Sequence, residues 1–188
     1  MLKTLTTATV YLVLAVTCGA QADEPKPSVS ADPLTAEQVA IYRAALADFK
    51  TGRARTPQIA NTTVPLRMMS VGRPHSTFVS CVDGIGTPSD QDQHQLVHRL
   101  DSSVVAGTDL PLVDFWEVPQ MRHGPPDPKA PHLGLLTLSE IAFDRDHLRA
   151  IVTYDFNCGG LCGGGKMLAL TKSGEEWKIS KICVRWMY

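Results

Sequence analysis

The stretch Ile151–Tyr188, which reads IVTYDFNCGGLCGGGKMLALTKSGEEWKISKICVRWMY, decides the kind of fold that the chain can adopt. Apolar and polar residues alternate through Arg149–Phe156, and Lys166–Lys172 holds the apolar run MLAL between two lysines. Alternation is typical of a strand with one buried face, and a short apolar run bounded by charges is typical of a strand covered on both faces. Both segments are therefore predicted to be β-strands.

Two further strands are predicted at Leu136–Phe143 and Glu176–Tyr188. Their apolar pattern changes phase once in each strand, at Ser139-Glu140 and at Ser180-Lys181. A β-bulge adds one residue to a strand, so a bulge at Ser180-Lys181 returns the large residues to one face. Ser173-Gly174 and the other intervening turn sequences join neighbouring strands, and we expect a four-stranded antiparallel meander.

The connection Cys158–Gly165, CGGLCGGG, contains five glycines among its eight residues. A glycine-rich backbone can form a nest of N–H groups that holds an anion, or it can let a ligand approach closely. Gly163 and Gly164 are the candidate ligand-binding residues of that interpretation. The simpler interpretation is a wide hairpin loop stapled by its own two cysteines, since such loops are common in small secreted domains.

Five motifs fall in about the last quarter of the chain: S-x-I-x-F at Ser139–Phe143, A-x-V-x-Y at Ala150–Tyr154, C-G-x-L-C-G-x-G at Cys158–Gly165, G-x-x-W-K-I at Gly174–Ile179, and Trp186. Together they resemble the C-terminal segment of a group of small, uncharacterised secreted bacterial proteins. The resemblance implies a bacterial envelope or secreted origin. It implies no activity and no set of catalytic residues.

The N-terminus has the features of a secretory signal peptide. Lys3 supplies a positive charge, Tyr11–Val16 is the core of a short apolar segment, and Ala20-Gln21-Ala22 is a small-residue cleavage site. The predicted organisation is a signal peptide at 1–22, a flexible leader at 23–33 and one α+β domain at 34–188.

The predicted location is therefore the periplasm or the extracellular space. The apolar segment is too short for a membrane span. A second interpretation is a lipoprotein acylated at Cys18, but Thr17 is a poor residue just before such a cysteine. The formal net charge of −1 shows no basic excess, so the sequence offers no electrostatic case for binding nucleic acid.

Four cysteines follow the predicted signal: Cys81, Cys158, Cys162 and Cys183. An even number in an oxidising compartment predicts two disulfides, for which three pairings are possible. We favour Cys158–Cys162 within the loop and Cys81–Cys183 between the upstream half and the last strand. The alternative is a zinc site, although Cys-x3-Cys lacks the usual second pair of ligands. We expect no cofactor.

A first helix is predicted to begin after Thr35, because TAEQ matches a capping box with Gln38 at its third position. Apolar residues at helical spacing form its core face, and Gly52 is expected to end it. The members of that face are Val39, Tyr42, Leu46 and Phe49. Gln58–Cys81 alternates weakly and is expected to give irregular or edge strands. The predicted fold class is α+β, with N-terminal helices packed on a curved antiparallel sheet that ends in the meander.

A second helix is predicted to begin at Ser89, and one side of it carries polar residues at spacings of four, four and three. These residues are Asp90, His94, His98 and Asp101. A histidine pair four residues apart on a helix can bind a metal ion, so His94 and His98 are the candidate ligands. The alternative is the polar face of an amphipathic helix, and HQLVH lacks the glutamate of a metalloprotease motif.

We consider three hypotheses for the function, and the sequence contains no catalytic motif that supports any of them. The first is a protein-binding module of the inhibitor or immunity type, directed at a toxin or a cell-wall hydrolase through the sheet face and the proline-rich segment Pro119–Leu133. The second is a small-ligand binder with a cone-like fold and an apolar cavity lined by Tyr154, Trp177 and Trp186. The third is a metal-dependent enzyme or metal carrier that uses the two histidines. A filled core at the three aromatic residues would count against the second.

Overall fold

The computed structural model describes residues 28–49, 56–66, 81–83, 85, 97–114, 133–158 and 162–187. The predicted signal peptide, His94 and nearly all of the proline-rich segment lie outside these ranges. Across the part of the chain that the structure describes, no helix is both long and apolar enough to cross a membrane.

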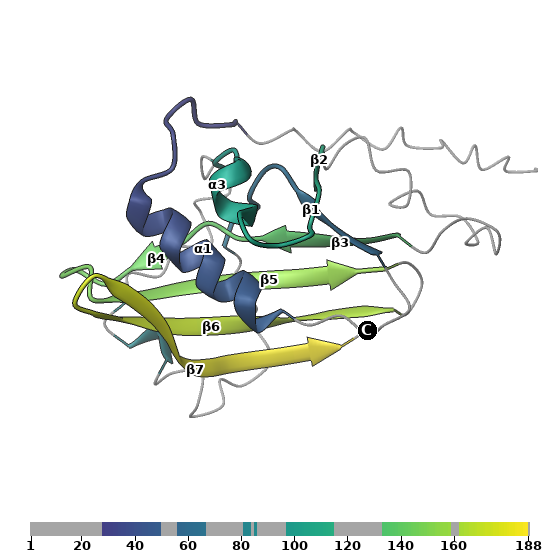
Figure 1. Cartoon of the computed structure of the whole chain (residues 1–188). Helices are drawn as coiled ribbons and strands as arrows, with labels where there is room; N and C mark the ends of the chain where they lie inside the picture. Colours follow the sequence, from purple (N-terminus) through teal and green to yellow (C-terminus); the bar gives the residue numbers. More distant parts are fainter. Residues whose placement is uncertain are drawn as a thin grey trace, which may run out of the picture.

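The described residues form one mixed β-sheet with two helices (Figure 1). The strands are β1 (Thr56–Ala60), β2 (Leu112–Val113), β3 (Leu133–Leu138), β4 (Ala142–Phe143), β5 (Arg149–Asn157), β6 (Gly163–Ser173) and β7 (Glu176–Met187). The helices are α1 (Ala36–Asp48) and α3 (Ser102–Val105). The strand order is β2-β1-β3-β5-β6-β7. The short strand β4 lies off this path and pairs with β5.

The fold is of the α+β class. The sheet is not wholly antiparallel, however, which corrects the prediction of an antiparallel sheet. β1 lies inside the sheet and runs parallel to both β2 and β3, whereas β3, β5, β6 and β7 pair antiparallel. Parallel neighbours need a long crossover, and the long connection from β1 to β3 provides one. The described part contains two helices, α1 and the single turn α3, and the predicted start of the second helix at Ser89 lies outside it.

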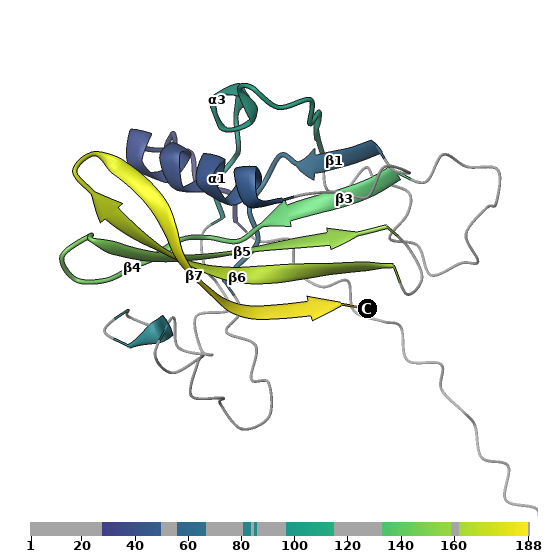
Figure 2. The same ribbon diagram turned by 60° about the horizontal axis from the view of Figure 1, so that its bottom comes forward.

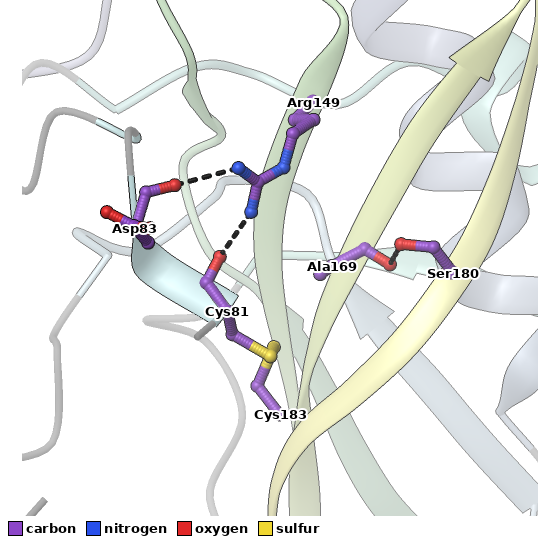
Figure 3. The surroundings of a disulfide bond; sticks show 6 residues. All are labelled: Cys81, Asp83, Arg149, Ala169, Ser180 and Cys183. Carbon is purple, nitrogen blue, oxygen red and sulfur yellow. Dashed lines mark hydrogen bonds between the residues drawn. A yellow bond between two sulfur atoms is a disulfide. The ribbon is translucent and has the colours of Figure 1, made fainter. Parts of the chain in front are cut away.

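The predicted phase changes coincide with irregular strand pairing. The first predicted strand is divided into β3 and β4 around Ser139, whose hydroxyl accepts a hydrogen bond from the Thr153 N–H at 2.8 Å. The register of β6 and β7 shifts twice, so Ser180 and Cys183 are extra residues on β7. The Ser180 hydroxyl donates to the carbonyl of Ala169 at 3.1 Å (Figure 3). The predicted bulge at Ser180 is thus confirmed.

Helix α1 lies across one face of the sheet and carries the predicted capping box. The Thr35 hydroxyl accepts from the Gln38 N–H at 3.2 Å, and the Gln38 side chain accepts from the Thr35 N–H at 2.8 Å. The helix ends at Asp48, earlier than predicted, and Phe49 is its C-cap. Tyr42 and Leu46 of the predicted core face are buried.

Two separate apolar cores lie on the two faces of the sheet. Figure 2 shows α1 and α3 on one side and the turn at 81–83 on the other. The larger core joins α1 to the inward side chains of β5 and β6, which include Val152, Leu168 and Leu170. The smaller core surrounds the buried Cys81. Both faces of β6 are therefore buried in its middle, as its apolar run predicts.

The two favoured disulfides are both present, Cys81–Cys183 and Cys158–Cys162. The first crosses from the turn at 81–83 to the bulge of β7. Arg149 strengthens this junction, because its guanidinium donates to the carbonyls of Asp83 at 2.8 Å and Cys81 at 3.1 Å (Figure 3). The Cys81–Cys183 disulfide and the Arg149 guanidinium together attach the turn at 81–83 to the sheet.

The predicted second helix does not extend through residues 97–100, which are extended. The Val97 N–H donates to the carbonyl of Ser28, and the Leu100 N–H donates to the carbonyl of Asn61. These N–H groups are therefore bonded to residues far away in the sequence rather than to the preceding helical turn. His98 consequently does not lie on a helical stripe with His94.

Candidate binding groove

An open groove of about 1070 Å³ runs along the side of α1 that faces away from the sheet. Helix α1 forms its floor, α3 contributes one wall at Ser103, and the turn between β6 and β7 contributes the other. In Figure 2 the β6–β7 hairpin bends up beside α1, and α3 lies above it. The lining residues are Leu34, Ala36, Val39, Ala40, Arg43, Ala44, Ser103, Glu175, Glu176 and Trp177.

The floor of the groove is apolar and nearly flat. Ala36, Ala40 and Ala44 recur every four residues, which places them on one stripe of the helix. The neighbouring stripe of the same helix, which includes Ile41 and Ala45, is completely buried against the sheet. Ala36 is exposed, whereas Ala40 and Ala44 are half-buried and pack against the larger core, so the described residues cover the alanine stripe only in part.

Charged side chains lie at both edges of this floor. On one side the exposed Arg43 donates from Nε to the carbonyl of Ser103 at 2.7 Å. On the other side Glu175 and Glu176 are exposed in the hairpin, and Glu176 pairs with Lys178 at 2.9 Å. Arg43 also lies near Asp101, so each edge of the groove carries charges of both signs.

Trp177 lines the wall formed by the hairpin and is 95% buried, with 5% of its surface exposed. Its ring lies edge-on to Phe143, with centroids 6.1 Å apart, and beneath the ammonium of Lys172 at 5.8 Å. The indole N–H is buried and has no hydrogen-bond acceptor among the described residues. An unpaired buried donor of this kind costs about 1–3 kcal/mol.

The three aromatic residues predicted to share a cavity do not lie together. Tyr154 is buried beneath the C-terminal end of α1, where its hydroxyl donates to Asp48 Oδ2 at 2.8 Å. Trp186 lies over the opposite face of the sheet and donates from Nε1 to Asp155 Oδ1 at 2.7 Å. Of the three residues, only Trp177 borders the groove.

Gly163 and Gly164 lie in β6, opposite Asn157 and Phe156 of β5. Their backbone therefore belongs to paired strands, whereas an anion nest needs successive N–H groups turned toward one ligand. The next glycine, Gly165, has a packing role that the sequence pattern does not reveal. A Cβ atom there would lie 2.4 Å from the ring of Trp186 and 2.2 Å from the carbonyl oxygen of Tyr154.

His98 belongs to a small polar cluster on the strap at 97–100. Its Nδ1 lies 2.9 Å from Glu140 Oε2, and its backbone N–H donates to the Thr63 hydroxyl at 2.8 Å. Thr63 also contacts the carboxylate of Glu140. The described ranges contain no group of three or more His, Cys, Asp or Glu side chains that could hold a metal ion, and His94 lies outside them. Glu140 is 42 residues from His98, so no local motif indicates this pair.

Comparisons with protein-family models, with curated proteins and with solved structures gave no match.

Proposed function

We propose that this protein is a secreted or periplasmic module, stabilised by two disulfides, that binds another protein through the groove along α1. The observation that supports the proposal is the apolar outer face of α1. Ala36 is exposed and Ala40 and Ala44 are only half-buried, so this stripe offers apolar surface on which a partner can pack.

The open shape of the groove favours a macromolecule over a small ligand. Small-molecule sites enclose most of their ligand, whereas this groove is open along α1. Tyr154 and Trp177 contribute instead to a filled core under the helix, which counts against the cone-like ligand binder.

The cysteines support the proposed compartment. Disulfides persist in the periplasm and outside the cell, and the predicted signal peptide agrees with that location. The resemblance of the C-terminal motifs to secreted bacterial proteins supports the same origin. Within the envelope, inhibitors of cell-wall hydrolases and immunity proteins against toxins are modules of this kind, and such an enzyme or toxin is the proposed partner.

The test compares capture of partners by the oxidised protein and by its Ala40→Arg variant. The arginine fills the middle of the groove floor, and the helix tolerates it because Arg is a good helix former. We expect a stoichiometric periplasmic partner that the wild-type protein retains and the variant loses by at least roughly tenfold. The matched control is Ala106→Arg, which adds the same side chain at an exposed alanine outside the groove lining.

Equal retention of every captured protein by the wild-type protein and Ala40→Arg would refute the proposal. Thermal unfolding of both variants verifies folding. Ala44→Arg provides a second substitution of the floor, one turn along the helix, and it is expected to act like Ala40→Arg.

A further inference from the structure

We infer that Cys158–Cys162 is an exchangeable disulfide, which a dithiol opens in the folded protein, and that its redox state controls the order of the adjoining start of β6. Cys81–Cys183 stays closed under the same conditions. The short bridge joins β5 to β6 at the end of β6 opposite the β6–β7 turn, so it lies away from the groove (Figure 1). The inference is therefore independent of the proposed function.

The two disulfides differ in their access to solvent. Cys81 is 1% exposed and Cys183 is 7% exposed. Cys158 is also buried, but Cys162 is only half-buried. A thiolate must reach a sulfur atom in order to attack a disulfide, so exposed bridges exchange readily and enclosed bridges resist reduction. Cys162 is therefore the point of attack.

Glycines surround the short bridge in the sequence. Five of the eight residues of Cys158–Gly165 are glycine, and none of these five has a side chain that could shield a sulfur atom. By contrast, Cys81 belongs to the smaller core, and its carbonyl accepts a hydrogen bond from Arg149 at 3.1 Å. Side chains of the smaller core thus enclose the long bridge, whereas the sequence places few side chains beside the short one.

The exchange step requires a dithiol as the reductant. A thiolate of the dithiol attacks Cys162 Sγ and forms a mixed disulfide, and Cys158 leaves as a thiolate that takes a proton from water. The second thiol of the reductant loses its proton and attacks the reductant's sulfur in the mixed disulfide, so that Cys162 leaves and is protonated likewise. Two electrons pass to the bridge, both cysteines gain a proton, and the dithiol becomes a disulfide.

The start of β6 depends on the short bridge for its position. Gly163 pairs with Asn157 next to the bridge, and Gly164 pairs with Phe156. The end of β5 has an anchor of its own, because the Phe156 ring packs on Phe49 with centroids 5.3 Å apart. Gly163 and Gly164 bring no side chain to either core, and glycine loses more conformational freedom in a strand than other residues do. Opening the bridge therefore releases this end of β6.

The effect of reduction ends where side chains hold β6. Trp186 packs on Gly165, and Lys166 Nζ lies 2.8 Å from Asp48 Oδ2 of α1. Beyond them, Met167–Leu170 is buried on both faces of the sheet. Local opening is confined to the segments of a protein that have few buried contacts. Reduction thus loosens the segment 162–164 and leaves the rest of the sheet in place.

The test treats the folded, oxidised protein with dithiothreitol in the absence of denaturant. An alkylating reagent traps the free thiols, and mass spectrometry assigns them to individual cysteines. We expect Cys158 and Cys162 to be alkylated at least roughly twentyfold faster than Cys81 and Cys183, which serve as the matched control in the same molecule. Equal rates for the two bridges, faster opening of the long bridge, or no reduction of the folded protein would overturn the inference.

Hydrogen exchange then tests the effect on the sheet. After selective reduction, the backbone amides of 162–164 should exchange at least roughly tenfold faster, while those of Met167–Leu170 keep their rates. The double variant Cys158→Ser with Cys162→Ser should reproduce this faster exchange and should no longer respond to dithiothreitol. Unchanged exchange at 162–164 after reduction, or equal acceleration throughout β6, would also overturn the inference.

Discussion

Two lysines of β6 hold the two ends of α1. Lys166 Nζ lies 2.8 Å from Asp48 Oδ2, and Lys172 Nζ lies 2.6 Å from Glu37 Oε1. Burial raises the pKa of Asp48, but hydrogen bonds from Lys166 and Tyr154 outweigh this effect and leave its pKa below the ordinary value. The hydrogen bond from Lys172 likewise lowers the pKa of Glu37. The charges that bound the apolar run of β6 thus fasten the helix.

These two carboxyl groups make stability depend on pH. Their pKa values are lower in the folded than in the unfolded protein, so the unfolded state binds more protons in acid. The stabilisation is complete above about pH 5 and is lost as the pH falls through the lowered values. We expect Asp48→Asn to cost about 1 kcal/mol in the free energy of unfolding at pH 7 and much less near pH 2.5. Urea unfolding at both pH values measures this difference.

The control for this prediction is Asp109→Asn, because Asp109 is an exposed carboxylate outside α1 and β6. It should change the free energy of unfolding by less than about 0.5 kcal/mol at both pH values. An Asp48→Asn cost that is the same at pH 7 and pH 2.5 would contradict the proposed role of the ion pair.

The unpaired indole N–H of Trp177 leads to a second prediction at this scale. Trp177→Phe keeps an aromatic ring and removes the unsatisfied donor, so the lost packing and the removed penalty nearly cancel. We expect a change in the free energy of unfolding within about 1 kcal/mol, whereas Trp177→Ala should cost about 3–5 kcal/mol. Chemical denaturation of the two variants distinguishes them, and a Phe variant as unstable as the Ala variant would show that the N–H has an acceptor.

Among the strands, glycines allow aromatic side chains to lie flat against the sheet. Gly165 lies beneath Trp186, and the ring of Phe156 occupies the space where Gly134 would carry a Cβ atom. These glycines therefore contribute to sheet packing. The tight turn at Gly174 is different, because its φ of +65° demands glycine while the space around it is open.

Replacement of glycine by alanine at these positions should have unequal effects. Gly165→Ala places a methyl group against the backbone of β5 and the ring of Trp186, and it should cost about 3 kcal/mol. Gly174→Ala strains only the local backbone and should cost about 1 kcal/mol. Urea unfolding measures both variants. If Gly165→Ala lowered the free energy of unfolding less than Gly174→Ala does, the close packing of Trp186 on β6 would be contradicted.

For the whole molecule, the two disulfides differ greatly in the length of chain that they close. Cys81 and Cys183 are 102 residues apart, whereas Cys158 and Cys162 are four residues apart. The long bridge joins the smaller core to the last strand. Cross-linking distant residues removes more conformational freedom from the unfolded chain than cross-linking near ones.

Removal of each disulfide by paired Cys→Ser substitution tests this difference. In the chain-entropy treatment, loss of Cys81–Cys183 costs about 4–5 kcal/mol and loss of Cys158–Cys162 about 2 kcal/mol. Equilibrium unfolding of the two double variants under identical oxidising conditions gives the comparison. If loss of Cys158–Cys162 lowered the free energy of unfolding more than loss of Cys81–Cys183 does, the prediction would be contradicted.

Features carried by local pattern could be predicted from the sequence. The alternation in Arg149–Phe156, the phase change at Ser180 and the capping box at Thr35 each depend on neighbouring residues, and each has its counterpart in the structure. The favoured disulfide pairs are also present. The prediction that the second helix extends through His98 was wrong, because hydrogen bonds to residues far away in the sequence outweigh the local helical preference there.

The sequence by itself determined the C-terminal strands and the start of α1, since periodicity and capping act over a few residues. It allowed three pairings of the cysteines, and the folded chain has Cys81–Cys183 and Cys158–Cys162. The tertiary structure decided which residues meet. Asp48 and Lys166 form an ion pair although they are 118 residues apart, and β1 pairs parallel with β3. Trp177 and Trp186 lie on opposite faces of the sheet. The tertiary structure also set α3 and the β6–β7 hairpin on either side of the alanine stripe. A groove exists only where elements distant in the chain come together, so no local pattern specifies it.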